Sequence, residues 1–309
     1  MNILITGAAG FLGTECNNLL FQHGHEVITT DRHGTVDIHG DLANKHFTDA
    51  LPDVDVVVNC AAVQYVTANL PLIKRKEYFF RNNVVTCRYL AERYNNQASA
   101  THFIHIGTSM MYRQTGQKIY DTTSTMGGEG VYSKSKMAGQ RFIDAIPGAA
   151  TIIPCIIGGI GREGLFRGFV SLMQRFALVM YPGSGTHKIH MVHVKDVARL
   201  VLCIINEKLS GYYNAAAPDP LSIREWITEM EDELNLKPVR QFSLPLKPIS
   251  FLAAMTGYRL LAREQLLMLG MPHVLNIEGS LKIGWTPQYS NARIARDIAA
   301  YISNTARKS

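Results

Sequence analysis

The sequence predicts an α/β protein built on a doubly wound parallel sheet, with a smaller and mostly helical C-terminal lobe. Short runs rich in β-branched residues alternate with longer amphipathic stretches through the N-terminal half of the 309-residue chain. The runs lack polar alternation, which is typical of strands buried on both faces. After about residue 158 this rhythm gives way to helical patterns rich in Leu and Met.

The N-terminal elements follow one another as strand and helix. Five apolar runs are the expected strands: residues 2–6, 26–30, 54–60, 102–107 and 150–157. Helices are expected over 10–24 and 81–96, where apolar residues recur at helical spacing. Because strands joined through helices form parallel crossover units, we predict one α/β domain over residues 1–160.

The C-terminal elements are expected to form a second unit. Helical patterns cover 164–177, 222–234 and most of 244–275. Residues 193–206 read as a helix that returns to the first domain, so 190–215 is assigned to that domain. The segments 161–189 and 216–309 are then predicted to form a substrate-binding lobe, with a cleft between the lobes.

Composition and charge exclude several kinds of partner. Lys and Arg number 31 against 25 Asp and Glu, a formal net charge of +6, but the basic residues are scattered. Nucleic-acid binding calls for a continuous basic stripe, so no nucleic-acid partner is predicted. No apolar run approaches the roughly 18 residues that span a bilayer. Five dispersed cysteines and an opening "MNILITGAAG" without a signal-peptide pattern predict a cytoplasmic protein.

A glycine-rich turn follows the first expected strand. Gly7, Gly10 and Gly13 are spaced G-x-x-G-x-x-G at a helix start, where backbone amides can approach a pyrophosphate. Asp31 ends the second strand, and a carboxylate there can accept hydrogen bonds from ribose hydroxyls and would repel a 2′-phosphate. The sequence therefore predicts NAD as cofactor and a dinucleotide-binding domain over 1–160. Arg32 could pair with a phosphate, so NADP stays open.

Further motifs occur in order along the chain: "GDLAN" (40–44), "NCAA" (59–62), "NVVT" (83–86), "IGTSMMY" (106–112), "YSKSK" (132–136), "HVKDVA" (193–198) and "IGWTP" (283–287). With the glycine turn, they make the chain resemble, nearly end to end, the extended short-chain dehydrogenase/reductases of the NAD-dependent epimerase/dehydratase family. One departure is Val85, where the family pattern N-V-x-G-T has glycine. The resemblance implies a Rossmann fold and a small-molecule substrate. By analogy with dimer contacts of the helix over 81–95 in relatives, it also suggests a homodimer.

The same resemblance implies a catalytic set of Thr108, Tyr132 and Lys136. Tyr132 would act as general acid/base, Thr108 would orient the reacting oxygen, and Lys136 would hold the nicotinamide ribose. A free phenol has a pKa of about 10, and we expect Lys136 and the positive nicotinamide ring to lower it. The cofactor is expected to contact Gly7, Gly10, Phe11, Leu12, Gly13, Asp31, Arg32, Asp41, Leu42, Cys60, Ala61, Ala62, Asn83, Tyr132 and Lys136.

Two departures from relatives bear on the reaction. Dehydratases that resemble this chain have an Asp-Glu pair after the threonine, where Ser109 and Met110 stand here. The arginines of sugar-nucleotide epimerases align with the aliphatic residues Ile153, Ile189 and Leu281, and an asparagine of theirs aligns with Ile156. We therefore predict hydride transfer between NAD(P) and a ketone or secondary alcohol of low polarity. An NAD-dependent sugar or sugar-nucleotide epimerase is the alternative, and a non-catalytic NAD(P)-binding sensor is the second alternative.

The substrate contacts are expected to come from both lobes. Gln64, Ser109, His187 and His190 are the candidates. The three histidines of "THKIHMVHV" suggest a metal site, but no clustered carboxylate or thiol completes a ligand set, so no metal is predicted. The apolar segment 243–270 could form a lid over the substrate, although the core of the lobe is the stronger expectation.

Overall fold

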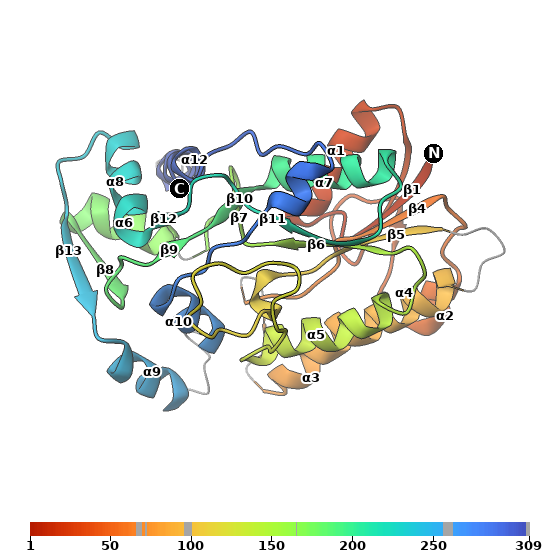
Figure 1. Cartoon of the computed structure of the whole chain (residues 1–309), viewed down its shortest axis with the longest axis horizontal. Coiled ribbons are helices and arrows are strands. Elements are labelled where there is room, and N and C mark those ends of the chain that lie inside the picture. The colour runs from red at the N-terminus through yellow and green to blue at the C-terminus, as the bar shows by residue number, and fades with distance from the viewer. Residues whose placement is uncertain (66–69, 72, 96–100, 165, 256–261, 307–309) are drawn as a thin grey trace.

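The computed structural model describes the chain except residues 66–69, 72, 96–100, 165, 256–261 and 307–309. Its centre is a seven-stranded sheet in the order β11-β6-β5-β4-β1-β2-β3 (Figure 1). Every neighbouring pair in this sheet is parallel. The doubly wound parallel sheet predicted from the sequence is therefore confirmed.

The strands of the sheet are β1 (Asn2–Thr6), β2 (Glu26–Asp31), β3 (Ile38–His39), β4 (Val56–Asn59), β5 (His102–Ile106), β6 (Ala150–Pro154) and β11 (Gly211–Ala215). Alternate side chains enter two different buried clusters. Ile3 and Ile5 of β1 pack in one cluster, and Leu4 packs in the other. Both faces of the sheet are thus buried, which explains the absence of polar alternation in the strands.

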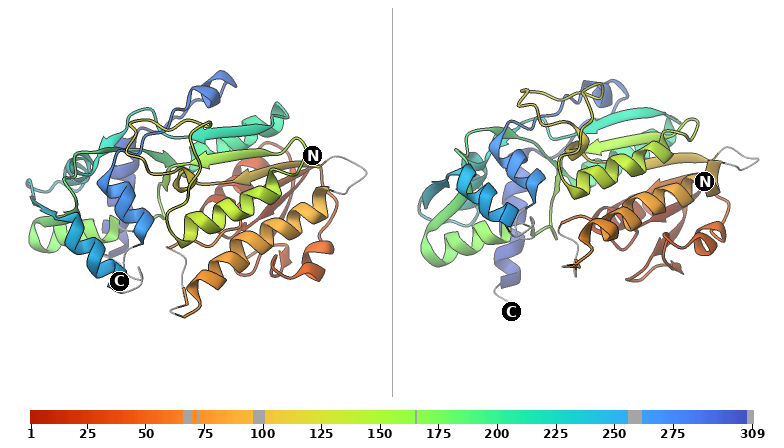
Figure 2. Two further views of the ribbon diagram at one scale, coloured as in Figure 1. Left: turned by 60° about the horizontal axis from the view of Figure 1, so that its bottom comes forward. Right: turned by 90° about the horizontal axis from the view of Figure 1, so that it is seen from below.

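Helices cover both faces of the sheet. On one face α1 (Phe11–Gln22) packs against α7 (Val194–Asn206). On the other face α4 (Thr86–Asn95) lies beside α5 (Val131–Ile143), as both views of Figure 2 show. The short helix α2 (Lys45–Asp49) packs against α4. β11 pairs with β6, so the segment 193–215 does return to the sheet.

The expected helix over 81–96 differs from the structure at its start. It continues directly from α3 (Arg75–Phe80) through one π-helical segment, η1 (Arg81–Val85), into α4. A π-helical turn adds a residue to the helical repeat and is frequent near functional sites. Here it places Asn82 on the cavity described below, whereas Asn83 faces the protein interior.

The C-terminal region forms its own buried cluster around α6 (Phe166–Phe176), α8 (Ile223–Glu233) and α12 (Asn291–Ala306). The expected helical stretch over 244–275 contains two helices, α9 (Leu246–Met255) and α10 (Arg263–Gly270). The remaining elements are η2 (Ser109–Met111), α11 (Glu278–Lys282) and the paired short strands β7 (Ile156–Gly158), β8 (Leu178–Pro182), β9 (Lys188–Ile189), β10 (Met191–His193), β12 (Leu221–Ser222) and β13 (Arg240–Leu244). Among the described residues, no helix is long and apolar enough to cross a membrane.

The strand order fixes where a ligand site can form. β1 lies between β2 and β4, so the chain proceeds outward from β1 in both directions. Loops at the carboxyl ends of neighbouring strands diverge at such a reversal and leave a crevice. Helices α6, α8, α9 and α10 lie beyond this edge of the sheet (Figure 1).

Candidate functional site

A cavity of about 550 Å³ opens at the carboxyl ends of the central strands. Its wall combines the turn after β1, the ends of β2, β4, β5 and β6, and residues of α5 and α10. The structure brings most of the residues singled out from the sequence to this one cavity: Gly7, Gly10, Phe11, Leu12, Gly13, Asp31, Arg32, Asp41, Leu42, Cys60, Ala61, Ala62, Gln64, Thr108, Ser109, Tyr132 and Lys136.

The glycine turn is closely packed against its neighbours. Gly7 has a φ of +65°, and a Cβ added there would lie 2.7 Å from backbone atoms of Ala61. A Cβ at Gly13 would overlap the carbonyl oxygen of Gly7. Gly10 is the N-cap residue of α1, and no side chain caps the amides of the first turn of this helix. This glycine cradle suits an anionic group at a helix N-terminus.

Asp31 and Arg32 both line the cavity, and their side chains make different contacts. The Ala9 N–H donates to Asp31 Oδ2 at 3.2 Å, and the Arg32 N–H donates to Asp31 Oδ1 at 2.6 Å. The guanidinium of Arg32 donates instead to Asn82 Oδ1 at 2.9 Å. The carboxylate is therefore fixed beside the glycine turn, while the guanidinium is directed towards η1.

Tyr132 is the second residue of α5, is buried, and lines the same cavity as Thr108. Burial raises the pKa of Tyr132 to about 12, while the hydroxyl of Thr108 and the positive charge of Arg162 act to lower it. In the protein without cofactor the pKa of Tyr132 is therefore above that of a free phenol, and the expected lowering by Lys136 and the nicotinamide ring stays a prediction. Removing the phenolate from water costs more than the neighbouring groups recover.

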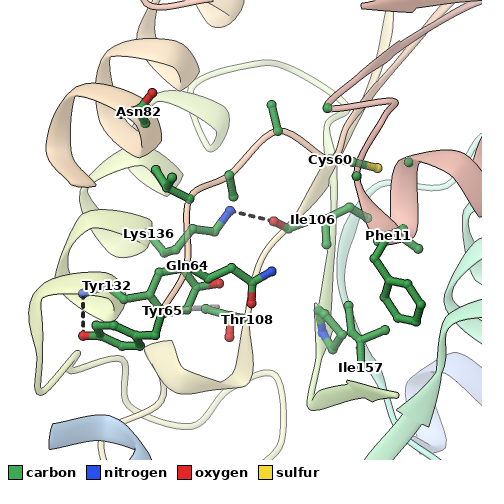
Figure 3. Close-up of a pocket in the computed structure, with 18 of the residues that line it drawn as sticks. Phe11, Cys60, Gln64, Tyr65, Asn82, Ile106, Thr108, Tyr132, Lys136 and Ile157 are labelled. Carbon is green, nitrogen blue, oxygen red and sulfur yellow. Dashed lines mark hydrogen bonds between the residues drawn. The ribbon is translucent and has the colours of Figure 1, made fainter. Parts of the chain in front are cut away.

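Lys136 lies one turn after Tyr132 and is also buried, and burial lowers its pKa. Its Nζ donates to the carbonyl of Ile106 at 2.7 Å, as Figure 3 shows, and lies 3.2 Å from His105 Nε2. These contacts tie α5 to the end of β5, two residues before Thr108. Lys136 therefore braces the relative position of the tyrosine and the threonine.

Arg162 is a functional candidate that the sequence reasoning missed. It lines the cavity, donates to Gln64 Oε1 at 3.1 Å, and lies with its guanidinium carbon 5.7 Å from the centre of the Phe11 ring. Burial lowers its pKa, and its charge acts on Tyr132. In the described part of the chain no carboxylate is paired with it. A lone arginine after the glycine-rich turn at 158–161 was the available signal. Cavity residues of the lobe, Gln265 and Met268, had no such signal.

Three residues singled out from the sequence do not line this cavity, and their expected cofactor or substrate contacts stay predictions. The side-chain amide of Asn83 accepts from the Val63 N–H at 2.8 Å and donates to the Val63 carbonyl and Ser135 Oγ, so it braces the chain after β4 against α5. His190 is buried and accepts from the Leu275 N–H through Nδ1. His187 is half-buried between β8 and β9, and no cavity contact is found for it.

Comparisons with known proteins agree with this architecture. The family model described as NAD dependent epimerase/dehydratase family matches residues 3–216. The spore coat polysaccharide biosynthesis protein SpsK of Bacillus subtilis is 28% identical over 241 residues, covering 76% of this chain and 80% of SpsK. The crystal structure of UDP-glucuronic acid 4-epimerase from Bacillus cereus in complex with NAD has a TM-score of 0.79 at 18% identity, covering 99% of each chain.

The human epimerase family protein SDR39U1, solved with NADPH, has a TM-score of 0.77 at 20% identity and covers 98% of this chain and 100% of its own. At such identities the structural likeness establishes the fold. The family model, however, spans more than half of the chain and includes the glycine turn, Thr108, Tyr132 and Lys136. The chain belongs to the NAD-dependent epimerase/dehydratase family.

Proposed function

We propose that the protein is an NAD(P)-dependent oxidoreductase that transfers a hydride between the nicotinamide and a ketone or secondary alcohol. The observation that supports this proposal is that Thr108, Tyr132 and Lys136 line one cavity together with the glycine turn. A proton-transfer group and a dinucleotide cradle in one cavity are the parts that this reaction needs.

The cavity fits the proposed cofactor. The close approach at Gly7 and the uncapped first turn of α1 suit the pyrophosphate, and the fixed carboxylate of Asp31 suits the ribose hydroxyls. Relatives solved with NAD and with NADPH support a nicotinamide cofactor here. We propose NAD in preference to NADP because Asp31 would repel a 2′-phosphate. When bound, the cofactor would supply or accept the hydride.

The roles of the chain's own residues follow from their surroundings. Burial keeps Tyr132 protonated at neutral pH, so it is suited to donate a proton to the oxygen of a carbonyl that is being reduced. Thr108 would orient that oxygen beside Tyr132. Arg162 would stabilise the phenolate that remains, since its positive charge already lowers the pKa of Tyr132.

The substrate end of the cavity favours a ligand of low polarity. Met110, Ile156, Ile157, Phe166 and Met268 are among the residues that line the cavity, and we infer that they face the substrate. The positions expected for diphosphate-binding arginines offer no free cation there. Ile189 is buried in the lobe, and the neighbouring Lys188 is paired with Glu225 at 2.6 Å.

Sugar epimerisation is the second candidate, and Arg162 is the observation that favours it. A guanidinium in the cavity suits a carboxylate or phosphate on the substrate. One structural relative is a UDP-glucuronic acid 4-epimerase. Net cofactor reduction in a substrate screen would support the oxidoreductase, whereas sugar conversion without net cofactor change would support the epimerase.

The test combines such a screen with one variant. Wild type and Tyr132→Phe are assayed on apolar ketones, secondary alcohols and nucleotide sugars, with NAD(H) and NADP(H). We expect Tyr132→Phe to bind the cofactor normally and to lose roughly 10²–10⁴-fold in turnover, the range for a lost general acid. Near-normal turnover would refute the mechanism. Cofactor binding without turnover on any substrate would instead support the sensor.

A further inference from the structure

The helix that contains Tyr132 begins without a cap of its own. Its N-cap position is Gly130, which has no side chain, whereas Ser, Thr, Asp or Asn usually stands at this position. The backbone of Gly130 is extended, with φ −120° and ψ −169°, which any residue can adopt. The glycine is therefore not explained by backbone conformation, and the first amides of α5 need partners from elsewhere.

Those partners come from the C-terminal lobe. Glu264 of α10 accepts through Oε1 from the Ser133 N–H at 3.1 Å and from Ser133 Oγ at 2.9 Å. Its Oε2 accepts from the Tyr65 hydroxyl at 2.7 Å. The Tyr65 oxygen in turn accepts from the Tyr132 N–H at 3.2 Å, a contact that Figure 3 shows. Two successive amides of α5 are thus capped by Glu264, directly or through Tyr65.

Gly130 and Glu264 are complementary in shape. A Cβ at residue 130 would overlap the Glu264 carboxylate in its present position, so a side chain there would have to displace the carboxylate. Glu264 is 3% exposed, and a buried carboxylate is costly unless hydrogen bonds satisfy it. The neighbouring Arg263 pairs with Glu129, and the hydrogen-bond donors of Ser133 and Tyr65 satisfy Glu264. The carboxylate is thus held at the start of α5 by the contacts that cap it.

The same helix α10 also lines the cavity, through Gln265 and Met268. A ligand in the cavity would therefore contact residues adjacent to the cap. We propose that Glu264 is a positioning residue: from the C-terminal lobe it caps α5 and fixes Tyr132 opposite Thr108. This inference rests on the catalytic role proposed above for Tyr132.

Hydrogen exchange tests the cap without any substrate. In Glu264→Ala we expect amide exchange in the first turn of α5, residues 131–134, to accelerate about tenfold, as for loss of a strong cap. Exchange in β4 and β5 should not change. Glu225→Ala is the matched control: Glu225 accepts from the Ser222 N–H at the start of α8 and makes no contact with α5. It should accelerate exchange in α8 and leave α5 unaffected.

A cap placed at residue 130 itself provides the reciprocal test. Gly130→Asp should destabilise the native protein, because the new side chain overlaps Glu264 and repels it. In the Glu264→Ala background the same change should restore protection of α5, since Asp is a good N-cap residue. Glu264→Gln keeps an oxygen that can accept from Ser133, so exchange in the first turn of α5 should be faster than in wild type and slower than in Glu264→Ala. This variant tests the cap even if the alanine variant does not fold.

Turnover then distinguishes positioning from general stability. With a substrate from the screen above, Glu264→Ala should lower kcat about tenfold and leave the dissociation constant of NADH unchanged, and Gly130→Asp in that background should restore kcat. The capping role would be overturned if Glu264→Ala and Glu264→Gln both exchanged the first amides of α5 at the wild-type rate. It would also be overturned if Gly130→Asp had the same effect on exchange in wild type and in Glu264→Ala. Restored protection without restored kcat would overturn the positioning role. Full activity of Tyr132→Phe would refute the proposed function and leave the exchange result intact.

Discussion

The choice between NAD and NADP depends on Asp31, and Asp31→Ala tests it. The carboxylate accepts from the amides of Ala9 and Arg32, which fixes it in the wall of the cavity beside the glycine turn. In this position its oxygens can accept hydrogen bonds from the ribose hydroxyls of the proposed cofactor. We expect the alanine variant to weaken NADH binding and to strengthen NADPH binding.

The size of the effect follows from two contributions. Hydrogen bonds to a charged group contribute about 1.5–3 kcal/mol. We take about 2 kcal/mol for the bonds that the half-buried Asp31 would make to the ribose. Their loss in the alanine variant corresponds to roughly 30-fold weaker NADH binding. Two unit charges about 4 Å apart in water interact by about 1 kcal/mol, so relief of repulsion of the 2′-phosphate should tighten NADPH binding roughly five- to tenfold. The preference should therefore change by about two orders of magnitude.

Fluorescence titration of NADH and NADPH on wild type and variant measures both constants. Asp37→Ala is the matched control. Asp37 accepts from the amide and the hydroxyl of Thr29, which lies on β2 together with Asp31, but Asp37 does not line the cavity. It should lower the unfolding temperature and affect both cofactors equally. Tighter binding of NADPH than NADH by the wild-type protein, or equal weakening of both in Asp31→Ala, would refute the reasoning.

Three other measurements test the site and the fold. Burial raises the pKa of Tyr132 to about 12, so the difference in phenolate absorbance between wild type and Tyr132→Phe should stay near zero up to about pH 10. A difference in this absorbance near neutral pH, measured without cofactor, would contradict the prediction. Burial lowers the pKa of His273 to about 4, whereas the unfolded chain has a histidine pKa of about 6.5. Below pH 6.5 the unfolded chain therefore binds a proton that the folded protein does not. The free energy of unfolding should fall by on the order of 3 kcal/mol between pH 6.5 and pH 4. His273→Gln should flatten the dependence of the unfolding temperature on pH, and an unchanged slope would count against this assignment. Gly7→Ala should weaken NADH binding at least about tenfold because of strain and overlap with Ala61, whereas Gly148→Ala, with a similar positive φ and open space, should not.

Much of the fold could be predicted because its signals are local. The runs that form β1, β4 and β5 are apolar on both sides, and this pattern requires a sheet covered on both faces. The glycine turn and Asp31 belong to one β-α-β unit, so their order along the chain already places them together. Thr108, Tyr132 and Lys136 were identified through motif order and family resemblance, and the structure brings them to one cavity.

The sequence by itself determined the sheet, the glycine turn and the family, because strand burial and turn geometry depend on neighbours in the chain. Only the tertiary structure decided the environment of Tyr132. Its pKa depends on burial and on Arg162, and its helix is capped by Glu264, which is 131 residues from Ser133 in sequence. Asn83 likewise reads as a cofactor contact, yet its amide is used by Val63 and Ser135. Desolvation and hydrogen bonds between distant segments are properties of the packed molecule, so no local pattern specifies them.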